Sequence, residues 1–154
     1  FHAPQKSVSQ ASQSLPTRTR KWQRTVDELA GRGLSLGELL DFYETLGRPD
    51  GPMPHYDPAV STTNDVVRQV IIPYTKTADG GGVAYATLLS QGAARQPQVM
   101  VTHSWTGRFL DLVAATVADA CGCDEYGSIA VDLASGGCER LRLQLERLGV
   151  LERK

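Results

Sequence analysis

The hydrophobic positions of this chain recur at helical spacing in three stretches, and these stretches predict its best-defined helices. The first runs from Ser35 to Leu46 and is followed by Gly47, a residue type that commonly ends a helix. The second covers residues 109–120, and the third covers residues 139–149. In the third stretch the positions expected to face the core are Leu141, Leu145 and Leu148.

Serine or threonine followed three residues later by glutamate occurs twice ahead of apolar stretches, and this spacing is the capping-box signature of a helix start. Thr25 and Glu28 predict a short first helix, which the glycines that follow would end. Ser35 and Glu38 predict the start of the helix that closes at Gly47. Two capped helices in succession predict a helical hairpin.

The middle of the chain carries mixed signals. Residues 48–60 contain four prolines and are expected to form an ordered loop. Residues 61–73 hold β-branched residues that favour a strand, but their polar caps and Asp65 in the first turn favour a helix, which we expect. A glycine-rich break precedes a short helix within residues 83–92, and residues 128–135 fit a strand or a helix.

The segment 98–103, with the sequence QVMVTH, is the best strand candidate because its β-branched residues lie between Pro97 and a polar pair. A strand followed at once by a helix, here over residues 109–120, is the unit from which α/β folds are built. No other segment is a clear strand. The expected fold is therefore a helix-rich α/β domain, an incomplete Rossmann-like unit with few strands preceded by the helical hairpin.

The loop between this strand and this helix is the first candidate site. In α/β folds such loops hold ligands, because the helix N-terminus supplies free amides and a partial positive charge. A histidine there could act as a general base, Ser104 or Thr106 could cap the helix, and an arginine could pair with a phosphate or carboxylate. The candidate ligand-binding residues are His103, Ser104, Trp105, Thr106 and Arg108. The alternative, which we favour, is a structural corner in which His103 and Trp105 pack.

Two other places carry aromatic residues beside charged or imidazole groups, and both are candidates for contact with a partner protein. One lies among the prolines of the 48–60 loop, and the other lies in a basic stretch near the N-terminus. The candidate partner-binding residues are His55, Tyr56, Asp57, Trp22 and Arg24. No phosphate loop, Rossmann glycine fingerprint or Ser-His-Asp arrangement is present in the sequence, so we assign no catalytic residue and expect no cofactor. Direct nucleic-acid binding is not expected either, since it would need a broader basic stripe.

The composition is that of one globular domain. The chain has 154 residues, 21% of them charged, and a net charge of -1, which favours neither nucleic acid nor an acidic surface as a partner. No run approaches the ~18 consecutive apolar residues that span a bilayer, so we expect no transmembrane helix, although peripheral attachment to a membrane complex is compatible. Residues 1–26 hold five basic residues and no acidic one, as in a transit-peptide remnant or a flexible arm. We expect a flexible basic arm at 1–21 and a single domain at 22–154.

The three cysteines do not form a disulfide framework, because their number is odd and their density is low. They are Cys121, Cys123 and Cys138. Buried reduced thiols are the expectation. A redox or metal site is the alternative, but a structural zinc would need a fourth ligand.

Two stretches together, MPHYDPAVSTTNDVVRQVIIP and QVMVTHSWTGRFLDLVAATVADA, resemble a large, poorly characterised family of proteins from dinoflagellate algae over roughly residues 25–154. The strand-THSW-helix portion also resembles the first strand and helix of TIR and fungal HET domains, which are Rossmann-like signalling modules. Some TIR domains hydrolyse NAD with a glutamate well downstream, and no glutamate of this chain stands in that motif. The first resemblance implies a plastid location, since plastid-targeting regions of that group often begin with phenylalanine, as FHAP does here.

These observations lead to two functional hypotheses. The leading one is a non-catalytic interaction or assembly module, an accessory subunit of a larger organellar complex, with a photosynthetic complex of the plastid as its host. It rests on the absent catalytic motifs and on a lone strand that leaves unpaired edges. The alternative is a TIR-like enzyme that binds or hydrolyses a nucleotide or NAD through the 103–108 loop. A cytoplasmic location is the alternative to the plastid.

Overall fold

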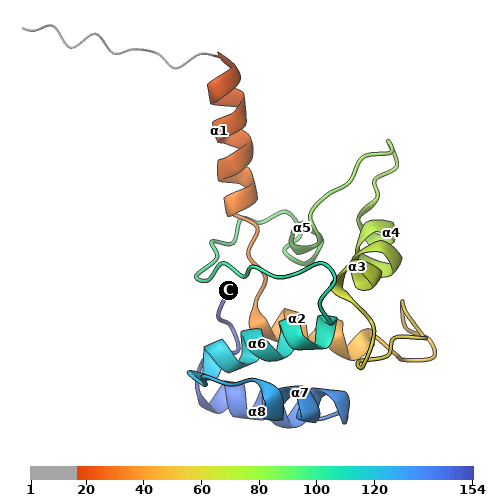
Figure 1. Ribbon diagram of the computed structural model, residues 1–154. Helices are drawn as coiled ribbons and strands as arrows, with labels where there is room; N and C mark the ends of the chain where they lie inside the picture. Colours follow the sequence, from red (N-terminus) through yellow and green to blue (C-terminus); the bar gives the residue numbers. More distant parts are fainter. Residues whose placement is uncertain (1–16) are drawn as a thin grey trace, which may run out of the picture.

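A computed structural model describes residues 17–154 of the chain, and every named element in it is a helix. In chain order the elements are α1 (Thr17–Ala30), α2 (Leu36–Thr45), α3 (Thr63–Val66), the π-helix η1 (Val67–Ile71), α4 (Ile72–Thr75), α5 (Tyr85–Leu89), α6 (Phe109–Cys121), α7 (Gly127–Ala134) and α8 (Cys138–Arg147). Figure 1 shows α2, α6, α7 and α8 packed together below, with α1, α3, α4 and α5 above them.

The expected α/β fold is wrong. Within residues 17–154 there is no strand and no sheet, and only three isolated bridges join extended residues. Residues 98–103 form no strand: the chain bends at Gln98 and then crosses the molecule without a helical turn (Figure 1), and no described segment pairs with these residues along their length. A sheet needs neighbouring strands, and the other apolar segments of this chain form helices instead. The structure therefore holds no Rossmann-like, TIR-like or HET-like unit.

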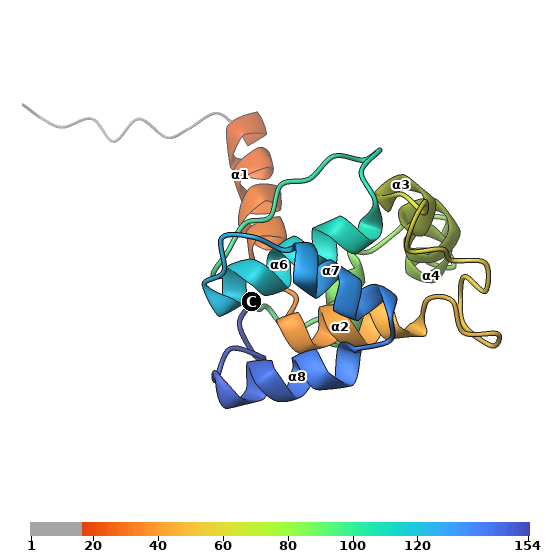
Figure 2. The same cartoon turned by 60° about the horizontal axis from the view of Figure 1, so that its bottom comes forward.

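The core lies where the lower helices meet the first turns of the upper ones. Its largest fully buried side chains are Leu40, Val66, Val70, Val113, Val117 and Leu145. At the junction the ring of Phe42 contacts Tyr85 of α5 and Phe109 of α6 edge to face, with ring centroids 5.1 and 5.9 Å apart. Figure 2, in which the bottom of the molecule comes forward, shows α7 in front, beside α6, and α8 beneath α2 in the view. A single core joins α2 with α6, α7 and α8, which lie much later in the chain, and no described residue of α1 belongs to it.

The second predicted helix is confirmed. Ser35 accepts a hydrogen bond from the backbone of Glu38, and the Glu38 carboxylate accepts one from the backbone of Ser35, which is the predicted capping box. Gly47 follows the helix with φ +75°, a conformation that glycine adopts without strain. The Glu38 carboxylate also pairs with Arg95, which joins the start of α2 to a distant loop.

The first helix differs from the prediction. It begins at Thr17, so residues 17–21, expected in the flexible arm, are helical, and residues 1–16 of that arm lie outside the described residues. Thr25 lies inside the helix, where its hydroxyl donates to the carbonyl of Lys21 at 3.2 Å. The expected capping box at Thr25 is therefore wrong, because a threonine in mid-helix bonds back to the preceding turn.

The helix expected over residues 61–73 is confirmed, with an interruption. Thr62 and Asp65 form its capping box, and Val66 and Val70 are both buried. In the middle the backbone opens to π-helical spacing, with the amide of Ile72 donating to the carbonyl of Val67. The next residue is a proline, which has no amide to continue the ordinary ladder, and the wider turn accommodates it.

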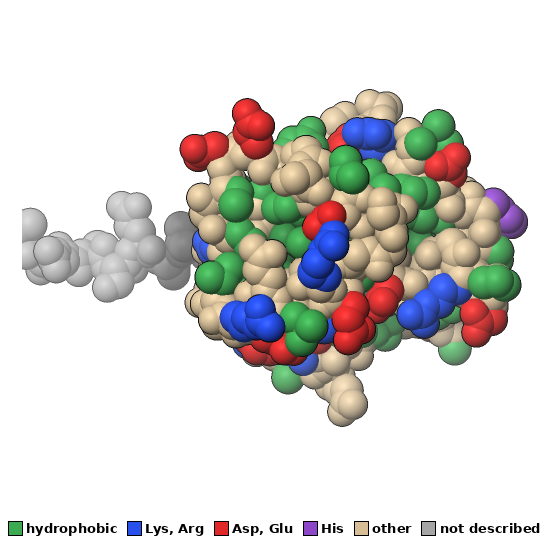
Figure 3. Space-filling view, turned by 90° about the horizontal axis from the view of Figure 1, so that it is seen from below, with side chains coloured by type: hydrophobic (Ala, Val, Ile, Leu, Met, Phe, Trp, Pro, Cys, Tyr) green, Lys and Arg blue, Asp and Glu red, His purple; other side chains and the backbone are tan. Residues whose placement is uncertain are grey.

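The remaining elements settle the open assignments. The short helix expected within residues 83–92 is α5, and the segment 128–135, which fitted two interpretations, belongs to α7. In α8 the predicted inward positions Leu141 and Leu145 are buried, but Leu148 is 52% exposed because it stands at the C-cap, where the helix ends. Figure 3 shows basic and acidic side chains side by side on the lower face, consistent with the ion pairs of α8, Arg140 with Asp132 and Arg142 with Asp41.

Candidate functional site

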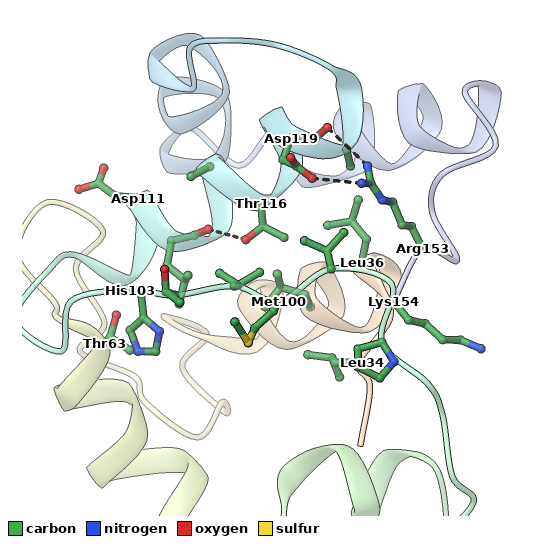
Figure 4. A pocket seen from close by; sticks show the side chains of 18 of the residues that line it. Leu34, Leu36, Thr63, Met100, His103, Asp111, Thr116, Asp119, Arg153 and Lys154 are labelled. Carbon is green, nitrogen blue, oxygen red and sulfur yellow. Dashed lines mark hydrogen bonds and ion pairs between the residues drawn. The ribbon is translucent and has the colours of Figure 1, made fainter. Parts of the chain in front are cut away.

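A cleft of about 720 Å³ lies between α2, α6 and the extended segment 97–104. Most of its wall is apolar, because the facing sides of α2 and α6 contribute leucine and alanine side chains. The apolar lining includes Leu34, Leu36, Leu39, Val99, Met100, Val101, Leu112 and Ala115. In Figure 4 the segment that carries His103 and Met100 runs below α6 in the view, and the Met100 side chain stands in the middle of the view. A site of this size and lining suits an apolar ligand or an apolar stretch of another chain.

The extended segment is tied down at its two ends and left unpaired between them. The backbone amides of Gln98 and Val99 both donate to the carbonyl of Lys154. No backbone hydrogen bond reaches residues 100–103 from any part of the described chain. The side chains of Met100 and Val101 are 86% and 46% exposed. Four consecutive residues therefore present free backbone donors and acceptors beside an apolar cleft.

The corner after this segment is held by the N-terminus of α3. The amide of Thr63 donates to the carbonyl of Gly107 at 2.9 Å, and the amide of Asn64 donates to the carbonyl of Trp105 at 3.0 Å. Within the corner Gly107 donates back to Ser104 at 3.1 Å, which closes a turn. The corner is thus held as a structural joint by its backbone, whereas the side chains of His103 and Trp105, which were expected to pack there, are exposed.

The expected helix-terminus site differs in detail. Neither Ser104 nor Thr106 caps α6, because Arg108 is the N-cap residue and makes no side-chain cap bond. The hydroxyls of Ser104 and Thr106 bond to each other instead, at 3.1 Å. The first amide of the helix, that of Phe109, donates to the carbonyl of Ser61. These contacts engage the groups that were expected to receive an anion.

Arg108 does not offer an open charge to a phosphate or carboxylate. Its guanidinium donates to both oxygens of Asp111 at 2.8 and 2.7 Å, a two-pronged ion pair. This hydrogen bonding raises the pKa of Arg108 further above its ordinary value. His103 meets the ring of Trp105 edge to face at 5.3 Å, and no hydrogen bond or ion pair joins it to another described residue. A general base would need an orienting partner, which this geometry lacks.

Of the five ligand-binding candidates, the structure brings three to the cleft. His103, Ser104 and Arg108 line it, whereas Trp105 and Thr106 do not, and Trp105 is 56% exposed. In Figure 4, Asp111 and His103 lie toward one end of the cleft and the Asp119–Arg153 ion pair lies at the other. Each acidic side chain that lines the cleft is thus paired with an arginine, so an apolar surface lies between compensated charges.

The partner-binding candidates of the proline loop divide between surface and core. His55 and Asp57 are exposed, while Tyr56 is half-buried with its ring edge to face on Tyr43 at 5.8 Å. The Tyr56 hydroxyl is buried without a hydrogen-bond partner among the described residues. Burial raises the pKa of Tyr56 far above its ordinary value and raises the pKa of Tyr43 to about 12. The other two candidates, Trp22 and Arg24, are exposed on α1.

The cysteines are free thiols in three different environments. Cys138 is buried, Cys121 is half-buried and Cys123 is exposed, so the expectation of buried thiols holds only for the first. Burial raises the pKa of Cys138 to about 11. Among the described residues no group of three or more histidine, cysteine or acidic side chains is arranged to hold a metal ion. The alternative of a metal site at the three cysteines finds no support in this arrangement.

Sequence reasoning found one edge of the cleft and missed its walls. The walls come from α2 and from the exposed side of α6, where Leu39 and Leu112 carried a usable signal. Both belong to apolar stripes wider than one buried face requires, and both remain only partly buried. Their pairing across the cleft could not be found, because it depends on how α2 and α6 pack.

None of the described helices is long and apolar enough to cross a membrane. Comparison of the chain with family models, with curated proteins and with solved structures gives no match. The resemblance to dinoflagellate proteins therefore stays an expectation, and the functional argument rests on the residues and their geometry.

Proposed function

We propose that this protein is a non-catalytic interaction module whose cleft receives an extended, apolar segment of a partner protein. The observation that carries the proposal is the unpaired backbone of residues 100–103 beside the apolar cleft. An extended segment with free donors and acceptors is a template for addition of another strand. The partner's backbone would pair with these residues, and its alternate side chains would enter the cleft.

The dimensions of the site support this occupant. The cleft follows α6 from Asp111 to Asp119, which at 1.5 Å per residue is about 12 Å. An extended peptide rises about 3.3 Å per residue, so about four of its residues fit along this length. Four is also the number of consecutive unpaired residues, 100–103.

The chemistry of the cleft favours binding over catalysis. His103 has no orienting acid among the described residues, and the Arg108 guanidinium is engaged by Asp111. The cleft walls supply apolar contact area, and both aspartates that line the cleft are paired with arginines, Asp111 with Arg108 and Asp119 with Arg153. A partner segment with small or branched apolar residues at alternate positions complements such a surface. The TIR-like alternative required a Rossmann-like sheet, and we do not retain it.

The wider setting of this module is part of the proposal. We infer that the partner belongs to a larger assembly, because an unpaired segment beside an apolar cleft offers a docking place for another chain. The basic, acid-poor residues 1–26 suggest an organelle as the host. The resemblance to dinoflagellate proteins suggests that this organelle is the plastid and that the assembly is a photosynthetic complex. Native gel electrophoresis of organelle fractions tests this setting. The protein should co-migrate with a large complex in the plastid fraction, and a monomer in the cytosol would contradict it.

The cleft itself is tested with peptides of known sequence. A phage-displayed library of random peptides is selected on the full chain, and the enriched peptides are synthesised and titrated calorimetrically. We expect enrichment of short peptides with alternating apolar residues. Met100→Asp and Ala115→Trp should each weaken their binding by at least about tenfold, the first by placing a charge on the segment and the second by filling the cleft.

The matched control is Val131→Asp, which introduces the same charge at an apolar residue of α7 that is 66% exposed and does not line the cleft. This variant should bind the peptides as the unchanged chain does. A library that yields no binding peptide would refute the proposal. Peptides whose affinity is the same in Met100→Asp, Ala115→Trp and Val131→Asp would also refute it, because they would bind elsewhere.

A further inference from the structure

Helix α1 carries an apolar stripe that the rest of the described chain leaves open. Trp22, Val26 and Leu29 have the spacing i, i+4, i+7, which places them on one face of the helix. Trp22 is 63% exposed and Leu29 is 53% exposed. Figure 1 shows α1 projecting away from the packed helices below it. These residues do not line the cleft, so this surface is separate from the proposed peptide site.

An isolated helix of this length needs a surface to cover its apolar face. A helix of 14 residues is only marginally stable in water, and most helical stability in proteins comes from packing of the apolar side. The stripe is narrow, but it includes a tryptophan, whose ring and N–H suit a boundary between apolar and aqueous surroundings. We therefore expect this face of α1 to lie against a surface in which an apolar layer adjoins a polar one.

The charge of α1 indicates the nature of that layer. The first acidic residue of the helix is Asp27, and the turns before it carry Arg20, Lys21 and Arg24 in addition to an arginine at position 18. At 100° per residue Arg20 and Arg24 fall opposite Trp22, with Asp27 beside them, and Lys21 falls on the flank. Most of the cationic residues therefore lie away from the apolar stripe, while position 18 falls beside it. Beyond this region Glu28 is paired with Arg32, which compensates its charge.

We propose that α1 lies flat on an anionic lipid bilayer, with the stripe of Trp22, Val26 and Leu29 in the headgroup region. An apolar stripe with an excess of lysine and arginine on the remaining surface is a feature of interfacial helices, and α1 carries four basic and two acidic residues. The chain as a whole has a net charge of -1, so the attraction to the anionic surface comes from α1 itself. The helix is about 21 Å long at 1.5 Å per residue, and it rests on the surface without crossing it.

Tryptophan fluorescence provides the direct test, because the chain has only two tryptophans. In the full chain carrying Trp105→Phe the signal comes from Trp22 alone. Vesicles of phosphatidylcholine mixed with an equal amount of phosphatidylglycerol should shift this emission to shorter wavelength and carry the protein to the top of a flotation gradient. Vesicles of phosphatidylcholine alone should do so far less, and added salt should weaken the binding.

Substitutions separate the cationic contribution from the apolar one. Each basic residue near an anionic surface contributes about a fivefold factor in affinity, so Lys21→Gln with Arg24→Gln should lower vesicle binding by roughly 25-fold. Leu29→Asp should abolish the emission shift. The control is Lys76→Gln with Arg147→Gln, which removes the same charge from exposed positions outside α1 and should change binding little. Circular dichroism confirms that the variants keep the helical content of the unchanged chain.

Several outcomes would overturn the proposal. Absence of an emission shift with anionic vesicles at low salt is one, and equal binding by the Lys21/Arg24 and Lys76/Arg147 double variants is another. Binding of a homopolymeric RNA that depends on Lys21 and Arg24, without vesicle binding, would assign α1 to nucleic acid instead. A dimer that buries Trp22 in the absence of lipid would assign the stripe to a second copy of the chain.

Discussion

At the residue scale, Glu38 joins more of the structure than any sequence motif suggested. Its carboxylate accepts from the backbone of Ser35 at 2.8 Å and pairs with Arg95, 57 positions away. Burial disfavours the charged carboxylate, but the hydrogen bonds from Ser35 and Arg95 outweigh it and hold the pKa of Glu38 below its ordinary value of 4.5. The capping box could be predicted from four adjacent residues, whereas the Arg95 contact required the folded loop.

This arrangement predicts a pH dependence of stability. Because the pKa of Glu38 is lower in the folded chain, the unfolded chain binds the proton first, and the stabilisation is present above pH 4.5 and is lost as the pH falls. Glu38→Gln keeps the capping geometry and removes the charge. We expect a loss of about 1–2 kcal/mol at neutral pH and a flatter decline in acid, measured by urea unfolding. Glu146→Gln, at an exposed position of α8, should match the unchanged chain at every pH.

A close backbone approach at Gly33 gives a second prediction. The amide of Gly33 donates to the carbonyl of Arg95 at 2.7 Å, and a Cβ added at Gly33 would lie 2.8 Å from that oxygen. Gly33→Ala should therefore destabilise the fold by about 1–3 kcal/mol in thermal or urea unfolding. Gly127→Ala is the control, because a Cβ there meets nothing within 4 Å, and it should leave stability unchanged or raise it slightly. Equal losses in both variants would contradict the described contact.

At the scale of elements, the apolar periodicity of the sequence predicted helices correctly, whereas the prediction of a strand, which rested on composition, was wrong. The segments of α2, α6 and α8 were found because a repeated apolar face has one structural solution. The segment 98–103 was expected to be a strand because its composition favours extended backbone, but it forms neither a strand nor a helix. Its pairing could not be read from its own residues, since strand pairing depends on a second segment.

Helix α8 tests how the apolar stripe divides at a helix end. Leu145 is fully buried, whereas Leu148 stands three residues later at the C-cap and is 52% exposed. Leu145→Ala should therefore cost about 2–5 kcal/mol of unfolding free energy. Leu148→Ala should cost no more than about 0.5 kcal/mol. Similar costs for the two substitutions would show that the stripe continues into the core past Arg147, contrary to the structure.

At the scale of the whole molecule, the described chain has two surfaces to which we assign binding partners. The cleft and its unpaired segment face a proposed peptide, and the stripe of α1 faces a proposed bilayer. Three residues that line the cleft, His103, Ser104 and Arg108, were predicted from the sequence as ligand-binding residues. That prediction assumed the strand-to-helix loop of an α/β fold, which the structure does not have. The walls contributed by Leu36 and Leu112 became adjacent only through the packing of α2 on α6, which single-sequence patterns do not encode.

Amide hydrogen exchange at residues 100–103 tests directly whether a peptide adds to this segment as a strand. It is read by NMR in the free chain and with a saturating amount of a selected peptide. Unpaired extended backbone predicts rapid exchange of these four amides in the free chain, beside slower exchange of the bonded amide of Val99. Binding of the peptide as an added strand predicts protection that alternates along residues 100–103, as strand pairing requires. Slow exchange of these amides in the free chain would contradict the proposal. Rapid exchange of all four amides at peptide saturation would also contradict it.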